Sequence, residues 1–176
     1  MDLLVTGAFP QLPRKLEALS WGINDQSNSY SGIFHRFLTQ VEILNKFSLC
    51  VHQVSLRDEW FLVEFMRNIK ADHLKISTFQ FTLETELSIF RDKFLKEVVH
   101  FIIQTRPSEV SLSFMLHFES DFDMIAPLFQ DLIYAGCNIR HILLYSNYGF
   151  TSHGLETIYS EMSKIKDLKV LTWDYV

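Results

Sequence analysis

The most constraining feature of this sequence is a short apolar pattern that recurs along the chain, each time near a stretch with helical periodicity. The pattern is L-x-x-L-x-L-x-x-N, and it occurs complete at Leu16, Leu19, Trp21 and Asn24 and again at Ile139, Ile142, Leu144 and Asn147. Its apolar part returns 29 residues later, at Leu168, Leu171 and Trp173. A pattern repeated at such intervals predicts a stack of similar strand–helix units.

These motifs resemble the leucine-rich repeat, in the longer form with a helix after each strand that is found in ribonuclease-inhibitor-like proteins. The resemblance implies a short α/β solenoid whose parallel strands follow one another in chain order, with the helices on the convex side. It is specific around the first, fifth and sixth strands. In the units between, Val54, Phe79 and Met115 stand where the family has a polar residue, so the repeats are degenerate.

Apolar periodicity places strands at 16–24, 47–54, 73–79, 110–116, 139–147 and 170–176, with helices at 32–45, after Asp58, at 88–105, after Asp121 and Asp123, and through 155–165. The expected first positions of the repeats are Leu16, Lys46, Ala71, Pro107, Ile139 and Leu168, which gives steps of 30, 25, 36, 32 and 29 residues. We expect one domain over residues 1–176, with 1–15 as an N-terminal cap.

The strands alternate between apolar and polar residues, which distinguishes a one-sided sheet from a doubly wound one. A sheet covered on both faces has strands that are apolar on both sides. Here the second face carries residues such as Ser48, Ser77, Ser111 and Ser113. We therefore expect one solvated face and sequential strand order.

Composition excludes several classes of function. The net charge is −5, and no run of basic residues exceeds Arg14-Lys15, so nothing indicates nucleic-acid binding. The two cysteines, Cys50 and Cys137, are expected to be free thiols in a reducing compartment. The apolar runs are too short to span a membrane, and the first residues make a poor signal peptide. We expect an intracellular protein, cytoplasmic or nuclear, without a cofactor.

Residues on the expected polar face are the candidate partner contacts. They are His52, His73, Lys75, Glu109, Phe114, His141, Tyr145 and Tyr175. Three of these are aromatic and are expected near the rim of the face. Aromatic residues among few charges are typical of the centre of a protein interface.

Two catalytic or metal-binding arrangements compete with that interpretation and are weaker. Cys50 and His52 share a strand face but have no orienting acid nearby in the sequence. A row of His73, Glu109 and His141 has ligand types that suit a metal but no supporting pattern around it. The motifs of nucleotide-binding and serine-hydrolase sites are absent.

The sequence therefore favours a non-catalytic protein-interaction module, an adaptor or scaffold that presents a sheet face to another protein. The alternative is a compact α/β enzyme with its site at the carboxyl ends of the strands, where strand order reverses. A third hypothesis is self-association, or assembly into a larger array, through the last strand, Val170 to Val176, which has no helix after it in the sequence.

Overall fold

The computed structural model describes residues 14–23, 40–52, 59–68, 74–84, 93–117, 120–146 and 150–175. The strands are β1 (Lys15–Ile23), β2 (Ile43–His52), β3 (Lys75–Glu84), β4 (Glu109–Leu116), β5 (Ile139–Ser146) and β6 (Val170–Tyr175). The helices are α2 (Glu59–Asn68), α3 (Lys93–Thr105), α4 (Ser120–Tyr134) and α5 (Ser152–Met162). The expected N-terminal cap lies outside these segments except for Arg14, exposed before β1, and Lys15, which begins it.

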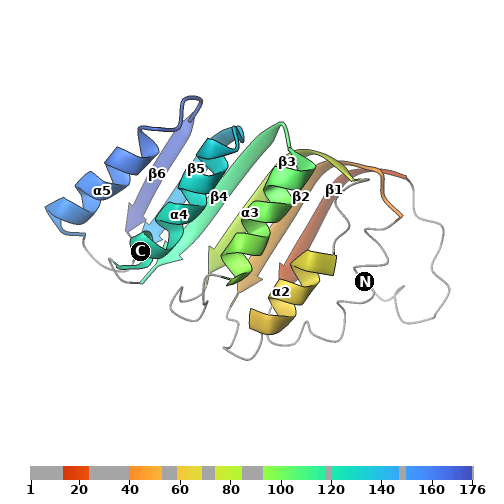
Figure 1. Ribbon diagram of the computed structural model, residues 1–176, viewed down its shortest axis with the longest axis horizontal. Helices are drawn as coiled ribbons and strands as arrows, with labels where there is room; N and C mark the ends of the chain where they lie inside the picture. The colour runs from red at the N-terminus through yellow and green to blue at the C-terminus, as the bar shows by residue number, and fades with distance from the viewer. Residues whose placement is uncertain are drawn as a thin grey trace.

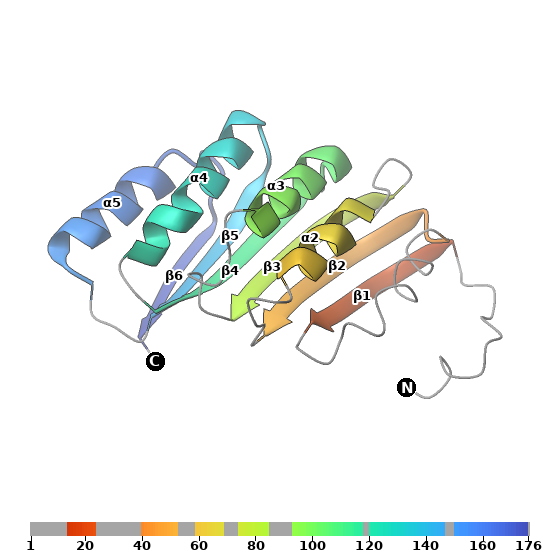
Figure 2. The ribbon, with the colours of Figure 1, turned by 60° about the horizontal axis from the view of Figure 1, so that its bottom comes forward.

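The strands form a single parallel sheet in the order β1-β2-β3-β4-β5-β6 (Figure 1). The four helices lie side by side on the same face of that sheet, as Figure 2 shows from a second direction. This confirms the predicted α/β fold of sequential parallel strands with helices on one side. In the described segments no helix has the length and apolarity to cross a membrane.

Helix-facing side chains form apolar rows that run across the sheet. One row contains Trp21, Leu49, Phe81, Leu112, Ile142 and Leu171, and the next contains Ile23, Val51, Leu83, Phe114 and Leu144. Most members of both rows are fully buried against the helices. Successive helices contribute the opposite layer, for example Phe94 and Ile102 from α3 and Phe129 and Leu132 from α4. The core is thus a single layer between the sheet and the helices.

Phenylalanine rings link the strands to the helices within this core. The ring of Phe114 lies 5.9 Å from that of Phe81 on β3 and 5.9 Å from that of Phe129 on α4, edge-on in both cases. Phe81 in turn contacts Phe94 of α3 at 6.0 Å. Edge-to-face pairs at such distances stabilise a core beyond the area that they bury. Neighbouring units are therefore joined through side chains as well as through the sheet.

The turns between α4 and β5 join adjacent units. Gly136 has φ of 72°, the left-handed conformation that ends many helices. The side-chain amide of Asn138 donates to the carbonyl of Ser108, 2.6 Å away, just before β4. At the other end of α4 the helix begins at Ser120, before Asp121 rather than after it. Asp121 lies inside the first turn and is buried, and its carboxylate accepts from the backbone N–H of His117 at 2.7 Å.

The strand pairing differs from the expected repeat steps. Leu16 pairs with Leu44 rather than with Lys46, and Leu44 pairs with Ile76. The later pairs are Phe79–Val110, Leu112–Ile142 and Ile142–Leu171, so the observed steps are 28, 32, 31, 30 and 29 residues. A shift of pairing occurs at Val110/Ser111 between β4 and β5. The repeats are therefore more uniform than the sequence pattern indicated.

Two expected element boundaries are wrong. The helix predicted over residues 32–45 cannot extend to its expected end, because β2 begins at Ile43 and Leu44 is a buried strand residue. The third strand does not stop at Phe79 but continues to Glu84. Residues 24–39 lie outside the described segments. In both places the strand is longer than expected: Leu44, expected in a helix, belongs to β2, and Phe81 and Leu83, expected in a loop, belong to β3.

The Phe114 contacts give a first testable prediction. Phe114→Ala removes a fully buried ring that joins two strands to α4, so we expect it to lower the free energy of unfolding by about 3–5 kcal/mol. Tyr134 of α4 is 96% exposed, so Tyr134→Ala should change the free energy of unfolding by less than about 0.5 kcal/mol. Urea denaturation followed by circular dichroism measures both. Equal effects would contradict this account of the core.

A second prediction concerns the edge at β6. Deleting residues 168–176 removes this strand and exposes the backbone donors and acceptors of β5, together with the β6 side of the apolar residues Ile142 and Leu144. We expect the shortened chain to aggregate, as measured by size-exclusion chromatography with light scattering. A monomeric product with an unchanged melting profile would refute the prediction.

Candidate functional site

The side of the sheet opposite the helices, called the open face below, carries the outward-pointing residue of each strand. These include Ser20, Ser48, Cys50, His52, Gln80, Thr82, Ser111, Ser113, Met115, His141, Leu143 and Tyr145. Five of these twelve are serine or threonine, because alternation in a strand sends most of the apolar residues to the helix side. The open face is therefore hydroxyl-rich, with a few larger side chains standing above it.

Five of the predicted contact residues lie on the open face. They are His52, Lys75, Glu109, His141 and Tyr145, each half-buried or exposed. His73 lies outside the described segments, and so does the side chain of Tyr175, although its backbone ends β6. Five of the eight candidates thus share one surface, spread over β2 to β5.

The expectation for Phe114 is wrong. Its side chain faces the helices and is fully buried, in contact with Phe129 of α4. Val110, Leu112 and Leu116 on the same strand have the same orientation and are also buried. Strand alternation places Phe114 on the same side as these residues. The expectation of a rim position came instead from the place of Phe114 in the repeat pattern. Phe114 is a core residue.

A shallow hollow lies on the open face near one of the predicted contacts. His141 Nε2 is 3.5 Å from Glu109 Oε1, so neighbouring strands pair these side chains as the sequence indicated. Beside them is a cavity of about 170 Å³, lined by Gln80, Ser111, Leu112, Ser113, His141, Ile142, Leu143 and Val170. The hollow is open, and more of its lining surface is apolar than polar. Its size suits a single inserted side chain rather than a cofactor.

A second cluster lies on the open face at the ends of β2 and β3. Cys50 Sγ is 3.9 Å from His52 Nδ1, and the same nitrogen is 2.7 Å from Glu84 Oε2. His52 and Glu84 are direct partners in the β2–β3 pairing. We expected no orienting acid beside Cys50 and His52, but the pairing of β2 with β3 brings Glu84 there. Glu84 was missed because the third strand was expected to end at Phe79.

This geometry does not match that of a cysteine nucleophile with its base. In a catalytic triad the nucleophile and the orienting acid contact different nitrogens of the histidine ring. Here Cys50 and Glu84 both approach Nδ1. Burial and the nearby charge of Glu84 raise the pKa of the Cys50 thiol from 9.0 to about 11, despite a hydrogen bond with Thr82. The thiol is thus held protonated, the opposite of what a nucleophile needs.

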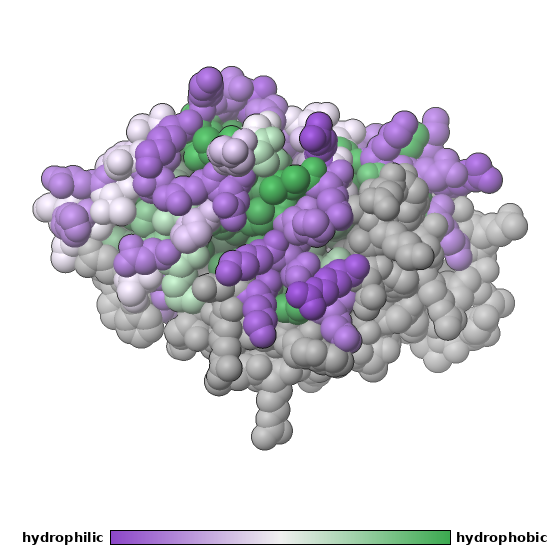
Figure 3. Space-filling model, viewed as in Figure 1, coloured by the Kyte–Doolittle hydropathy of each residue, from purple (hydrophilic) through white to green (hydrophobic). Residues whose placement is uncertain are grey.

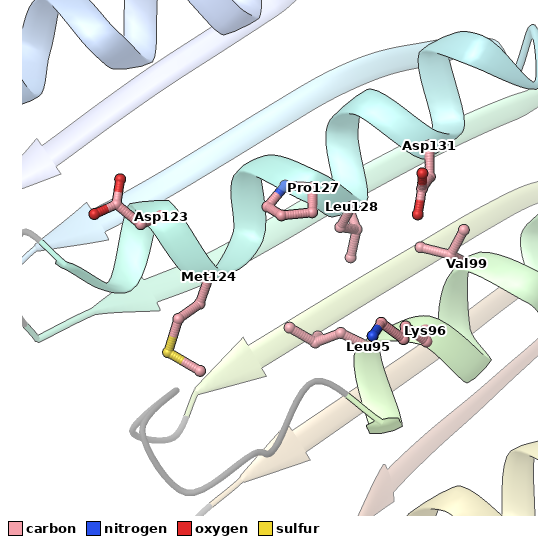
Figure 4. Close-up of a pocket in the computed structure, with 8 residues that line it drawn as sticks. All are labelled: Leu95, Lys96, Val99, Asp123, Met124, Pro127, Leu128 and Asp131. Carbon is pink, nitrogen blue, oxygen red and sulfur yellow. The ribbon is translucent and has the colours of Figure 1, made fainter.

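The helix side of the molecule has a groove of its own. It lies between α3 and α4 and has a volume of about 340 Å³. Figure 4 shows Leu95, Lys96 and Val99 on α3 facing Asp123, Met124, Pro127, Leu128 and Asp131 on α4. Figure 3 shows apolar surface in this central part of the helix side, bordered by hydrophilic side chains. Leu95, Val99 and Leu128 in this groove are buried.

The raised thiol pKa leads to a prediction of chemical reactivity. At pH 8 the thiolate fraction of Cys50 should be about 100-fold lower in the folded protein than in the unfolded chain, because its pKa is about 11 rather than 9.0. We expect iodoacetamide to label Cys50 correspondingly slowly, as measured by peptide mass spectrometry with and without urea. The same difference makes stability fall as pH rises from 9.0 to about 11, since the unfolded thiol ionises first. Equal labelling rates in the two states would contradict the assignment.

Comparison of the chain with models of protein families, with curated proteins and with solved structures gives no match.

Proposed function

We propose that this protein is a non-catalytic interaction module that binds another protein through the open face. The observation that carries the proposal is the one-sided architecture, in which all described helices cover the same face of the sheet. The other face presents polar side chains on an ordered array of strands. Such a surface is preorganised, so a partner binds it with a small loss of conformational entropy.

The size of the open face suits a protein partner. Six strands about 4.8 Å apart and roughly 6–10 residues long span an area of about 24 Å by 20–33 Å. One side of a typical specific protein interface buries about 800 Å². The described sheet therefore offers about the area that one such partner needs. The hollow beside His141 would receive an anchoring side chain at its centre.

The strand order weighs against the enzyme alternative. In open α/β enzymes the site lies where the strand order reverses, so that adjacent loops separate and leave a crevice. The described sheet runs from β1 to β6 without such a reversal. The Cys50–His52–Glu84 cluster has the wrong contacts for thiol catalysis. An interaction surface is the function that these features support best.

The proposal predicts that alanine substitutions on the open face abolish binding of a partner protein, whereas alanine substitutions on the helix side do not. Two double variants are compared as baits. The open-face variant carries His141→Ala and Tyr145→Ala, and the helix-side variant carries Tyr134→Ala and Tyr159→Ala. The second pair lies on the helix side, where the two rings are 96% and 64% exposed. Affinity capture with quantitative mass spectrometry should show a protein retained by the wild type and the helix-side variant and lost, at least tenfold, from the open-face variant.

Circular dichroism and melting temperature establish that each variant is folded. Retention of every captured protein by the open-face variant would refute the proposed surface. Loss of a captured protein from the helix-side variant alone would also refute it, and would indicate that the partner binds the helix side.

A further inference from the structure

We propose that Cys50, His52 and Glu84 form a binding site for a divalent transition-metal ion of the zinc class on the open face. These residues bring one thiol sulfur, one imidazole nitrogen and one carboxylate oxygen together, all within 4.8 Å of one another. The set combines the three side-chain types that bind Zn²⁺ in proteins. The proposal is independent of the protein-interaction function and can fail without affecting it.

The fold explains why these three side chains meet. Cys50 and His52 are two residues apart on β2, so both point to the open face. The parallel pairing then places Glu84 beside His52 and Thr82 beside Cys50. Gly22 on β1 has no side chain, and a Cβ there would lie 4.0 Å from Cδ2 of His52, which leaves the imidazole room on that side. The site is thus built by three neighbouring strands.

The distances are close to those of a tetrahedral zinc site. Bonds of about 2.3 Å to sulfur and about 2.0–2.2 Å to nitrogen and oxygen put tetrahedral ligand atoms roughly 3.3–3.6 Å apart. The observed separation of Sγ and Nδ1 is 3.9 Å, and that of Nδ1 and Oε2 is 2.7 Å. The third separation, from Sγ to a carboxylate oxygen of Glu84, is within 4.8 Å, so metal binding requires the carboxylate to move away from Nδ1 and closer to Sγ. The Glu84 side chain is 45% exposed, so it has the freedom to make this movement.

The ligand types select the class of metal. A thiolate with an imidazole favours Zn²⁺ and similar ions, whereas Mg²⁺ and Ca²⁺ prefer sites made of oxygen atoms.

On binding, the Cys50 S–H bond breaks, the sulfur electron pair forms the bond to the metal, and the proton passes to solvent. The positive ion also relieves the unfavourable interaction between a Cys50 thiolate and Glu84. Three protein ligands leave a fourth position for water or for a group from another molecule.

The second histidine–glutamate pair on the open face provides an internal comparison. His141 and Glu109 also lie on adjacent strands, with Nε2 and Oε1 3.5 Å apart. In the described part of the chain, the Cys50 cluster is the place where three potential ligands come this close. The His141 pair lacks a thiol, so replacement of His141 should leave metal binding unchanged.

The test uses the metal itself on the full chain. The protein is first stripped with a chelator and then titrated with Co²⁺, which reports a cysteine ligand through a thiolate-to-metal charge-transfer band. Zn²⁺ affinity is measured by competition and by calorimetry. We expect one ion per chain, with affinity reduced at least tenfold by Cys50→Ser, by His52→Ala and by Glu84→Gln. His141→Ala and Cys137→Ser should bind as the wild type does.

The wild-type spectrum keeps the test decisive if a variant fails to fold. The chain has two cysteines, so a charge-transfer band that survives Cys137→Ser assigns the ligand to Cys50. Absence of that band in the wild type, or its loss in Cys137→Ser, overturns the proposal. Zn²⁺ binding that persists unchanged in folded Cys50→Ser overturns it as well.

Discussion

The structure depends on one constraint, which is that every strand has a single apolar side and every helix a single apolar stripe. A strand–helix connection between parallel strands is almost always right-handed. When each new strand is added to the same edge of the sheet, as from β1 to β6, right-handed connections place every helix on the same side. The apolar rows of the strands must then all face that side. The one-sided core and the open face are two results of the same rule.

That constraint also explains how neighbouring units are held together. Phe81 contacts Phe94 of α3 on one side and Phe114 of the next strand on the other. Phe114 in turn contacts Phe129 of α4. The described rings thus pack both within a unit, as Phe81 does with Phe94, and between units, as Phe81 does with Phe114. Contacts of the second kind are the general reason that stacked repeats are stable while single repeats are not.

The sequence predicted the face of most strand residues, with Phe114 as an exception, but not the pairing of the strands. Alternation repeats every two residues, so the two-residue error at the first step, Lys46 instead of Leu44 opposite Leu16, keeps Leu49 and Val51 on the helix side. The second and third steps were wrong by seven and five residues, because β3 continues beyond the expected end of the strand. The continuation of β3 was visible, because Phe81 and Leu83 keep the alternation up to Glu84. Ending that strand early hid the acid beside His52.

The open-face pairs have a different origin from the core. Ion pairs and hydrogen bonds between exposed side chains contribute at most about 1 kcal/mol to folding. Both His52 and Glu84 are 45% exposed, and so is His141, which has Glu109 as its partner. The sheet would be about as stable with threonine or serine at these positions, as it has at Thr82 and Ser111. Folding therefore gives little reason for two histidine–glutamate pairs on this face. We propose that binding is the reason, with a metal ion at the Cys50 cluster and a partner protein at His141.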